Sequence, residues 1–93
     1  MTWTVRLTSR AEKDLRHWRR SDRATFEKCV ALLKELEIDP TNLETTGRPE
    51  WLKGELTGCM SRRINQVDRC VYEVHTDAHL IVVLQLRFHY DDR

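Results

Sequence analysis

Apolar and polar residues alternate with two different periods along the chain, and these periods predict its first elements. From residue 3 to residue 7 every second side chain is apolar, which is the pattern of a half-buried β-strand. Ser9 and Glu12 have the spacing of a capping box at the start of a helix. Apolar residues then recur at helical intervals to about Arg20, so the sequence predicts a strand followed by a helix.

A second, longer helix is predicted after Ser21-Asp22, where the first helix ends and the chain can be capped again. Apolar residues mark the flanks of this helix to about Glu37, and charged residues fill its outer face. Because only a short break separates the two helices, we expect them to form a hairpin. The segment from Asp39 to Gly58 contains both prolines and all three glycines, which predicts irregular structure about twenty residues long. Loops of that length in compact domains usually carry function.

Three further strands are predicted in the second half of the chain, joined by turns short enough for antiparallel hairpins. They span Cys59 to Ile64, Arg69 to His75 and Leu80 to Phe88. The order β-α-α-β-β-β predicts an α+β fold in which an antiparallel sheet carries the two-helix hairpin on one face.

Alternation within these strands separates an apolar face, which the helices would cover, from a polar face. In the last strand it predicts an apolar side made of Leu80, Val82, Leu84, Leu86 and Phe88. The two earlier strands contribute Met60, Ile64, Cys70, Tyr72 and Val74 to the same side. The polar side chains expected together on the exposed side are Ser61, Arg63, Arg69, Gln85, Arg87 and His89. The sequence therefore predicts a site on that face.

Composition narrows the class of protein. The 93 residues suffice for one modest core, so we expect residues 1–93 to form a single domain. Sixteen basic and fifteen acidic residues nearly balance, which argues against nucleic-acid binding through overall charge, although cations are in local excess between Gly47 and Arg69. Three cysteines without a CxxC pair argue against a disulfide framework or a zinc site. No long apolar run occurs near the N-terminus, so we expect a cytoplasmic protein without membrane contact.

The polar residues at these positions fit metal-free cleavage of RNA. That reaction needs a base for the 2′-hydroxyl proton, cations for the charged phosphorane and an acid for the departing 5′-oxygen. Glu50, beside a proline that limits the local backbone, is the candidate base. Arg69 and Arg63 can hold non-bridging phosphate oxygens in fork geometry. Protonated His89 is the candidate acid.

Four neighbouring residues complete the candidate set. Lys53 adds a cation near Glu50, and Tyr90 can orient the histidine or stack on an unpaired base. Ser61 and Arg62 are candidates for binding substrate. These residues also have ordinary explanations, because Arg62-Arg63 can be a solvated pair and the polar face of the sheet can simply be wet. Spacing alone leaves the function open.

Five motifs follow one another in order: Gly47-Arg48-Pro49-Glu50-Trp51-Leu52-Lys53, Leu56-Thr57-Gly58, Ser61-Arg62-Arg63-Ile64, Asp68-Arg69-Cys70-Val71-Tyr72 and His89-Tyr90. Together they resemble the YoeB family of toxins, within the RelE superfamily of toxin-antitoxin modules. The resemblance runs nearly from end to end, and several ordered motifs are far more specific than one.

The resemblance implies a toxin that cuts messenger RNA in the decoding site of a translating ribosome, without a metal or other cofactor. The implied products are a 2′,3′-cyclic phosphate and a free 5′-hydroxyl. The implied roles are general base for Glu50, general acid for His89, main transition-state arginine for Arg69, supporting cations for Lys53 and Arg63, and terminal positioning residue for Tyr90. The implied fold is an antiparallel sheet with two helices on one face.

The implied partner is a small acidic antitoxin, YefM-like or Axe-like, whose carboxyl-terminal segment wraps the toxin, and members of the family can also form homodimers. Two other functions stay open. The protein can be a non-catalytic inhibitor that occupies the decoding site, or a ParE-like toxin that acts on DNA gyrase. The chain departs from the family pattern at Cys59-Met60, where aromatic residues are common, and in the Asp91-Asp92-Arg93 extension after Tyr90.

Overall fold

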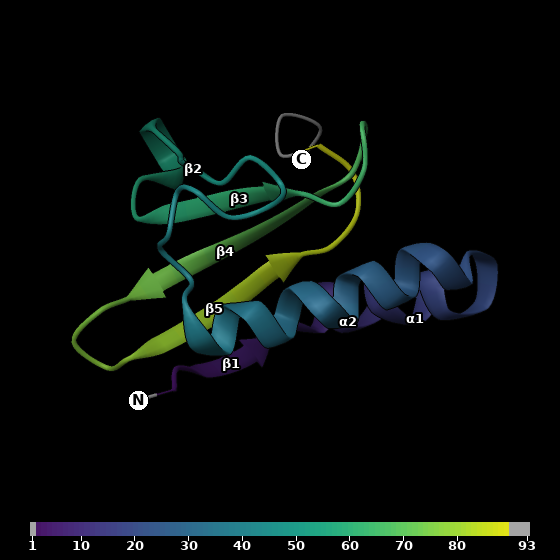
Figure 1. Ribbon diagram of the computed structural model, residues 1–93, viewed down its shortest axis with the longest axis horizontal. Helices are drawn as coiled ribbons and strands as arrows, with labels where there is room; N and C mark the ends of the chain where they lie inside the picture. Colours follow the sequence, from purple (N-terminus) through teal and green to yellow (C-terminus); the bar gives the residue numbers. More distant parts are fainter. Residues whose placement is uncertain (1, 90–93) are drawn as a thin grey trace.

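A computed structural model describes residues 2–89 as an α+β fold, with two helices and a five-stranded sheet (Figure 1). The elements are β1 (Thr4–Leu7), α1 (Ser9–Ser21), α2 (Arg23–Ile38), β2 (Glu50–Trp51), the 3-10 helix η1 (Gly54–Leu56), β3 (Cys59–Arg63), β4 (Arg69–His75) and β5 (Leu80–Gln85). The strands lie in the order β1-β5-β4-β3-β2. Both predicted helices and all four predicted strands are present.

Side-chain caps set the starts of the two helices. Thr8, one residue before the predicted cap, caps α1, and its hydroxyl accepts a hydrogen bond from the Ala11 amide. Asp22 separates the helices and caps α2 by accepting from both the amide and the hydroxyl of Thr25. These hydrogen bonds hold the pKa of the Asp22 carboxyl below its usual value, because they favour the charged form.

The sheet differs from the prediction at both edges. β1 pairs in parallel with β5, so the sheet is mixed rather than wholly antiparallel. The segment predicted to be irregular contains β2, which pairs antiparallel with β3, and the single turn η1. A two-residue strand carries too little alternation to be recognised in sequence, and its partner lies ten residues further along the chain.

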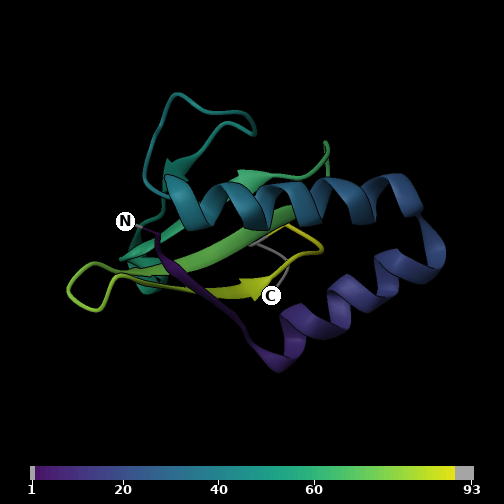
Figure 2. The ribbon, with the colours of Figure 1, turned by 60° about the horizontal axis from the view of Figure 1, so that its bottom comes forward.

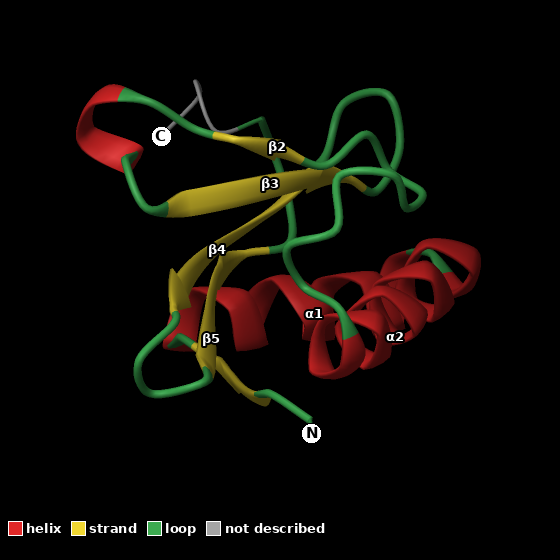
Figure 3. Cartoon of the chain, turned by 60° about the vertical axis from the view of Figure 1, so that its left-hand side comes forward, coloured by secondary structure: helices red, strands yellow, loops and turns green. Residues whose placement is uncertain are grey.

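Both helices cover one face of the twisted sheet (Figures 2 and 3). The core between them joins residues of α2 to the side chains of β3, β4 and β5 that point to this face: Cys29, Leu32, Leu36, Met60, Cys70, Tyr72, Ile81 and Val83. Burial of these apolar side chains supplies the main stabilisation of the fold. No helix among residues 2–89 combines the length and apolarity needed to cross a bilayer.

The opposite face is only partly open. Leu52, Cys59 and Val71 are buried there, with Leu56 and Leu84 packed against them. This smaller cluster lies under η1 and β2, and it leaves the other end of the same face to polar side chains. The predicted polar face is therefore divided into an apolar half and a polar half.

The side-chain directions predicted for β5 are wrong in its first half, and a bulge restores them at Gln85. Tyr72 pairs with Val83 but its neighbour Val71 pairs with Gln85, so Leu84 is an extra residue. Before the bulge, Ile81 and Val83 face the helices, which is the reverse of the prediction. After it, Gln85 shares the face of Val71, as predicted.

Candidate active site

Six polar side chains line a cavity of about 260 Å³ at the polar end of the sheet face that the helices leave uncovered. They are Arg48, Glu50, Ser61, Arg63, Arg69 and His89. Five of these residues lie between positions 48 and 69, and His89 is added from the end of the described chain. The structure thus brings together four predicted site residues of the greatest chemical interest: Glu50, Arg63, Arg69 and His89.

The pairing of β2 with β3 fixes the carboxylate in the cavity. Glu50 lies directly opposite Ser61, so both side chains point to the same face of the sheet. Ser61 is almost fully buried, whereas Glu50 is exposed. Lys53, two residues after β2, precedes η1 and is exposed, and it is not among the residues that line the cavity.

Two arginines face each other across the end of the β3–β4 hairpin. Arg63 and Arg69 are paired residues at the last position of the ladder. The Nη1 atom of Arg69 donates to the carbonyl oxygens of Asn65, at 3.0 Å, and Asp68, at 3.1 Å. Because the guanidinium is planar, these two bonds fix its orientation, and only 8% of the residue is exposed. Arg69 is therefore a preorganised cation, while Arg63 is exposed.

The turn before β2 adds an arginine that the sequence analysis did not select. Gly47 and Arg48 both have left-handed backbone, with φ of 86° and 46°. The Gly47 carbonyl accepts a 2.6 Å hydrogen bond from the Arg63 amide, so this turn lies directly against β3. A Cβ atom at Gly47 would lie 3.0 Å from the Arg63 carbonyl oxygen. This close approach brings Arg48 to the cavity. The only indication of Arg48 in the sequence was the local excess of cations between Gly47 and Arg69.

His89 reaches the cavity because the chain beyond β5 turns toward the β3–β4 hairpin (Figure 1). Side chains of α1 hold the start of this segment: Asp14 accepts from the Leu86 amide at 3.0 Å, and the Trp18 indole donates to the Leu86 carbonyl at 2.8 Å. The Phe88 carbonyl then accepts from the Arg69 amide at 2.9 Å. His89 is thereby attached to the same strand end as Arg69. Tyr90, the remaining predicted catalytic residue, lies outside the described residues.

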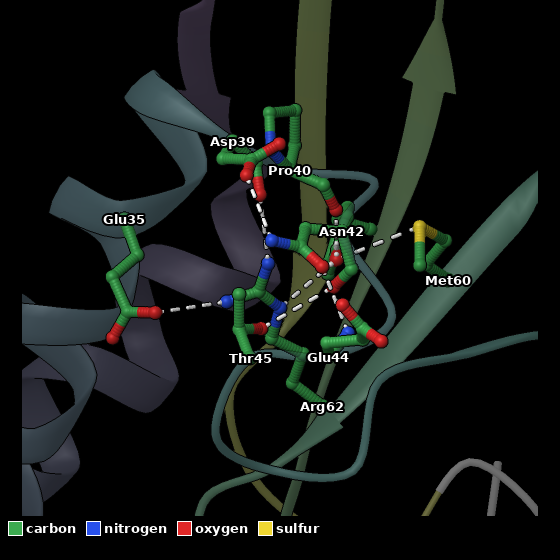
Figure 4. Close-up of polar contacts among 9 residues, drawn as sticks. Glu35, Asp39, Pro40, Asn42, Glu44, Thr45, Met60 and Arg62 are labelled. Carbon is green, nitrogen blue, oxygen red and sulfur yellow. Dashed lines mark hydrogen bonds and ion pairs between the residues drawn. The ribbon is translucent and has the colours of Figure 1, made fainter.

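Arg62 does not line the cavity, and its side chain points toward Glu35 and Asp39 on the helix side of the sheet (Figure 4). It is fully buried, and its guanidinium donates to the Tyr72 hydroxyl at 3.3 Å, the Glu35 carboxylate at 3.2 Å and the Asp39 carbonyl at 3.0 Å. Strand parity explains this placement, because neighbours along β3 point to opposite faces. The interpretation of Arg62 and Arg63 as a solvated pair is wrong for Arg62, which is fully buried. For the same reason Arg62 is not placed to bind substrate, contrary to the prediction from the sequence.

The charges around the cavity suit a phosphodiester. Three guanidinium groups and an imidazole surround one carboxylate, so the cavity combines a net positive charge with one potential proton acceptor. Arginine forks bind phosphate oxygens, a carboxylate can take a proton and an imidazolium can deliver one. Among residues 2–89 no three His, Cys, Asp or Glu side chains are grouped closely enough to hold a metal ion.

Solved structures with this architecture include bacterial toxins. The structure of a YoeB/ParE toxin from Agrobacterium tumefaciens has a TM-score of 0.85 and 34% identity, over 94% of this chain and 99% of that one. YoeB from Staphylococcus aureus, solved as a dimer, gives 0.81 and 33% over 95% and 98%. The same Staphylococcus aureus toxin, in a heterotetrameric complex with YefM, gives 0.80 and 33%, again over 95% and 98%. The fold is thus that of the YoeB toxins.

Sequence comparison gives the family. Residues 7–90 match the model of the YoeB-like toxins of bacterial type II toxin-antitoxin systems. Toxin YoeB from Streptomyces coelicolor is 40% identical over 86 residues, which are 92% of this chain and 98% of that protein. The chain belongs to the YoeB-like toxin family, whose members are ribosome-dependent endoribonucleases. The predicted family, fold class and enzyme class are confirmed.

Proposed function

We propose that this toxin cleaves messenger RNA on the translating ribosome through Glu50, Arg69 and His89, without a metal ion. The observation that supports the proposal is the shared cavity: a carboxylate, three arginines and a histidine line one volume of about 260 Å³. They come from the turn before β2, from β2, β3 and β4, and from the chain after β5. A structural role does not require these five groups to converge on a cavity, whereas an in-line attack on a phosphodiester does.

The proposed reaction moves two protons and exchanges one bond at phosphorus. The Glu50 carboxylate takes the proton of the 2′-hydroxyl, and the resulting oxygen attacks the adjacent phosphorus. Arg69, already oriented by two carbonyl oxygens, stabilises the charge that develops on the non-bridging oxygens, and Arg63 and Arg48 support it. Protonated His89 gives its proton to the departing 5′-oxygen as the P–O5′ bond breaks. The products are a 2′,3′-cyclic phosphate and a 5′-hydroxyl.

The remaining predicted residues take supporting roles in this proposal. Ser61 lies opposite Glu50 on the same face of the sheet and lines the cavity, so we assign its hydroxyl to binding the sugar of the substrate. Lys53 is exposed beyond β2 and contacts the flanking RNA backbone or the ribosome rather than the scissile phosphate. Tyr90 follows His89 directly in the sequence, and we assign it to positioning the nucleotide by stacking.

We also propose two protein partners and a location. The YoeB protein of Staphylococcus aureus is solved both in a complex with YefM and as a dimer. A cavity lined by three arginines offers a natural anchor for an acidic antitoxin segment, which would order on binding. A dimer of this chain is the second expected assembly. Since translating ribosomes are the substrate, the cytoplasm is the site of action.

Growth after induced expression, combined with primer extension on a known transcript with and without translation, tests the proposal. Glu50→Ala, Arg69→Ala and His89→Ala are compared with wild type and with Arg20→Ala, which removes an exposed cation of α1. We expect translation-dependent cuts to fall about 10²–10³-fold without the Arg69 guanidinium and about 10²–10⁴-fold without the acid or base. Arg20→Ala should cut like wild type.

Two results would contradict the proposal. Cleavage at the wild-type rate by all three variants would remove the assigned roles. Growth inhibition that persists in every variant, with intact transcripts, would show a toxin that blocks the ribosome by binding alone.

A further inference from the structure

The segment that carries His89 lies beyond β5, and it is held by side chains together with one backbone hydrogen bond, from the Arg69 amide to the Phe88 carbonyl. β5 ends at Gln85, yet residues 86–89 continue toward the cavity. Phe88, immediately before His89, has left-handed backbone with φ of 68°, a region that a bulky residue adopts only when its surroundings impose it. We propose that Gln85 and Asp68 are positioning residues that impose this conformation and thereby set His89 in the active site. This inference rests on the proposed role of His89.

Gln85 holds the two carbonyl groups that precede His89. Its residue is 1% exposed, and its Nε2 atom donates to the Arg87 carbonyl at 2.9 Å and to the Phe88 carbonyl at 3.1 Å. An amide NH₂ group has two hydrogens, so both bonds can form at once. The bulge at Leu84 is what turns Gln85 to this face. A carboxylate at position 85 would have the same shape but no donor for either carbonyl.

Asp68 holds the amide of Phe88 and links it to the arginine. Oδ1 accepts from the Phe88 amide at 2.7 Å, and Oδ2 accepts from Asn65 Nδ2 at 2.9 Å. The carbonyl of the same residue accepts from Arg69 Nη1. The residue is 8% exposed, so water competes little for these groups. One residue therefore positions both the proposed phosphate-binding cation and the proposed acid.

Together these contacts satisfy Phe88 on both sides. Its amide donates to Asp68, and its carbonyl accepts from Gln85 and from the Arg69 amide. Without Gln85 or Asp68, Phe88 can relax from its left-handed conformation, which would swing the following residue away from the cavity. A displacement of about 1 Å at a reacting group can cost about a hundredfold in rate. We expect a loss of that size in catalysis with little change in ribosome binding.

The first experiment compares Gln85→Glu with Gln66→Glu in single-turnover cleavage on programmed ribosomes. Gln66 is exposed in the β3–β4 turn, so its variant matches the change of charge without touching residues 86–89. We expect Gln85→Glu to lower the cleavage rate about a hundredfold, and Gln66→Glu to cut like wild type. Toxin concentrations at half-saturation should agree for both. Equal rates for the two glutamate variants would overturn the inference for Gln85.

A second experiment uses the hydrogen-bond pattern around Asp68. An asparagine there has one acceptor oxygen where the site needs two, so Asp68→Asn should lose either the Phe88 or the Asn65 contact. The double variant Asn65→Asp with Asp68→Asn restores both, because the donor and acceptor between the two side chains are simply exchanged. We expect cleavage to fall in the single variant and to recover in the double variant. Loss without recovery would overturn the inference for Asp68.

A double-mutant cycle of Gln85→Glu with His89→Ala separates an effect on the position of His89 from a general loss of stability. If Gln85 acts through His89, Gln85→Glu should slow the wild type strongly but leave the residual rate of His89→Ala unchanged. An equal factor in both backgrounds would mean a structural role and would overturn the inference. Wild-type cleavage by His89→Ala itself would instead refute the proposed function, so the two failures are distinguishable.

Discussion

Replacing Arg62 by lysine should destabilise the protein while sparing catalysis. The guanidinium of Arg62 is fully buried between β3 and the end of α2, where three of its nitrogens donate to three different acceptors. A lysine keeps the charge but brings it to a single atom on a flexible stem, which cannot reach the Tyr72 hydroxyl, the Glu35 carboxylate and the Asp39 carbonyl at once.

The expected loss follows from the acceptors left behind. Tyr72 is fully buried and the hydrogen bond to the Asp39 carbonyl is partly buried; a hydrogen bond from a charged donor contributes roughly 1.5–3 kcal/mol. The Glu35 side chain is 45% exposed, so water can replace its partner and that ion pair counts for about 0–1 kcal/mol. If lysine retains one of these two bonds, the free energy of unfolding falls by about 1.5–4 kcal/mol. For a domain of this length the melting temperature should drop by at least about 6 °C.

Urea unfolding followed by tryptophan fluorescence measures the stability, and single-turnover cleavage per folded molecule measures the chemistry. Arg63→Lys is the matched control, because Arg63 is exposed and lines the cavity. It should unfold within about 0.5 kcal/mol of wild type but cleave more slowly. An unchanged urea midpoint for Arg62→Lys would refute the stabilising role of the buried network. A cleavage defect as large as that of Arg63→Lys would show that Arg62 contacts substrate.

Three further predictions concern strain and titration. Gly47→Ala should lower the free energy of unfolding by about 1–2 kcal/mol and slow cleavage, because a Cβ atom there meets the Arg63 carbonyl; wild-type values for both would contradict this. Burial raises the pKa of Tyr72 to about 12, so stability should fall between pH 10 and 12 as the unfolded state alone loses the proton, less steeply in Tyr72→Phe. Burial also raises the pKa of Cys29 and Cys70, so neither thiol should be alkylated before unfolding, as peptide mass spectrometry can show.

Local patterns in the sequence were sufficient to predict both helices and the four longer strands, because each contains a full period of apolar residues. The partner of β1 could not be predicted in this way, since the residues that pair lie 76 positions apart in the chain. The same applies to β2, whose two residues acquire strand geometry only from their pairing with β3. Edge strands are decided by the rest of the sheet rather than by their own propensity.

The wrong parity in β5 has a different cause. All its side chains from Leu80 to Leu84 are apolar, so alternation offers no signal for either face. The bulge at Leu84 then shifts the period by one, which turns Gln85 to the face predicted for it. Bulges leave no reliable trace in a single sequence, although here the bulge places a residue beside the proposed active site.

The sequence was enough to select Glu50, Arg69 and His89, which line the cavity. It could not separate Arg62 from Arg63, because only the sheet shows that the two side chains point to opposite faces. Two adjacent arginines look alike in sequence, but their surroundings differ in kind. Arg62 is matched by a carboxylate, which balances its charge where it is buried.

The two hydrogen bonds that orient the Arg69 Nη1 atom come from neutral carbonyl oxygens and therefore do not cancel its charge. A group meant to stabilise a developing anion must be fixed in place and must still be positively charged, and carbonyl acceptors meet both conditions. The chain before His89 is also fixed through backbone groups, by the side chains of Gln85 and Asp68, and none of these bonds is made to the imidazole itself. The fold thus orients the proposed catalytic groups through their backbone or one edge, at a cavity that both Arg69 and His89 line.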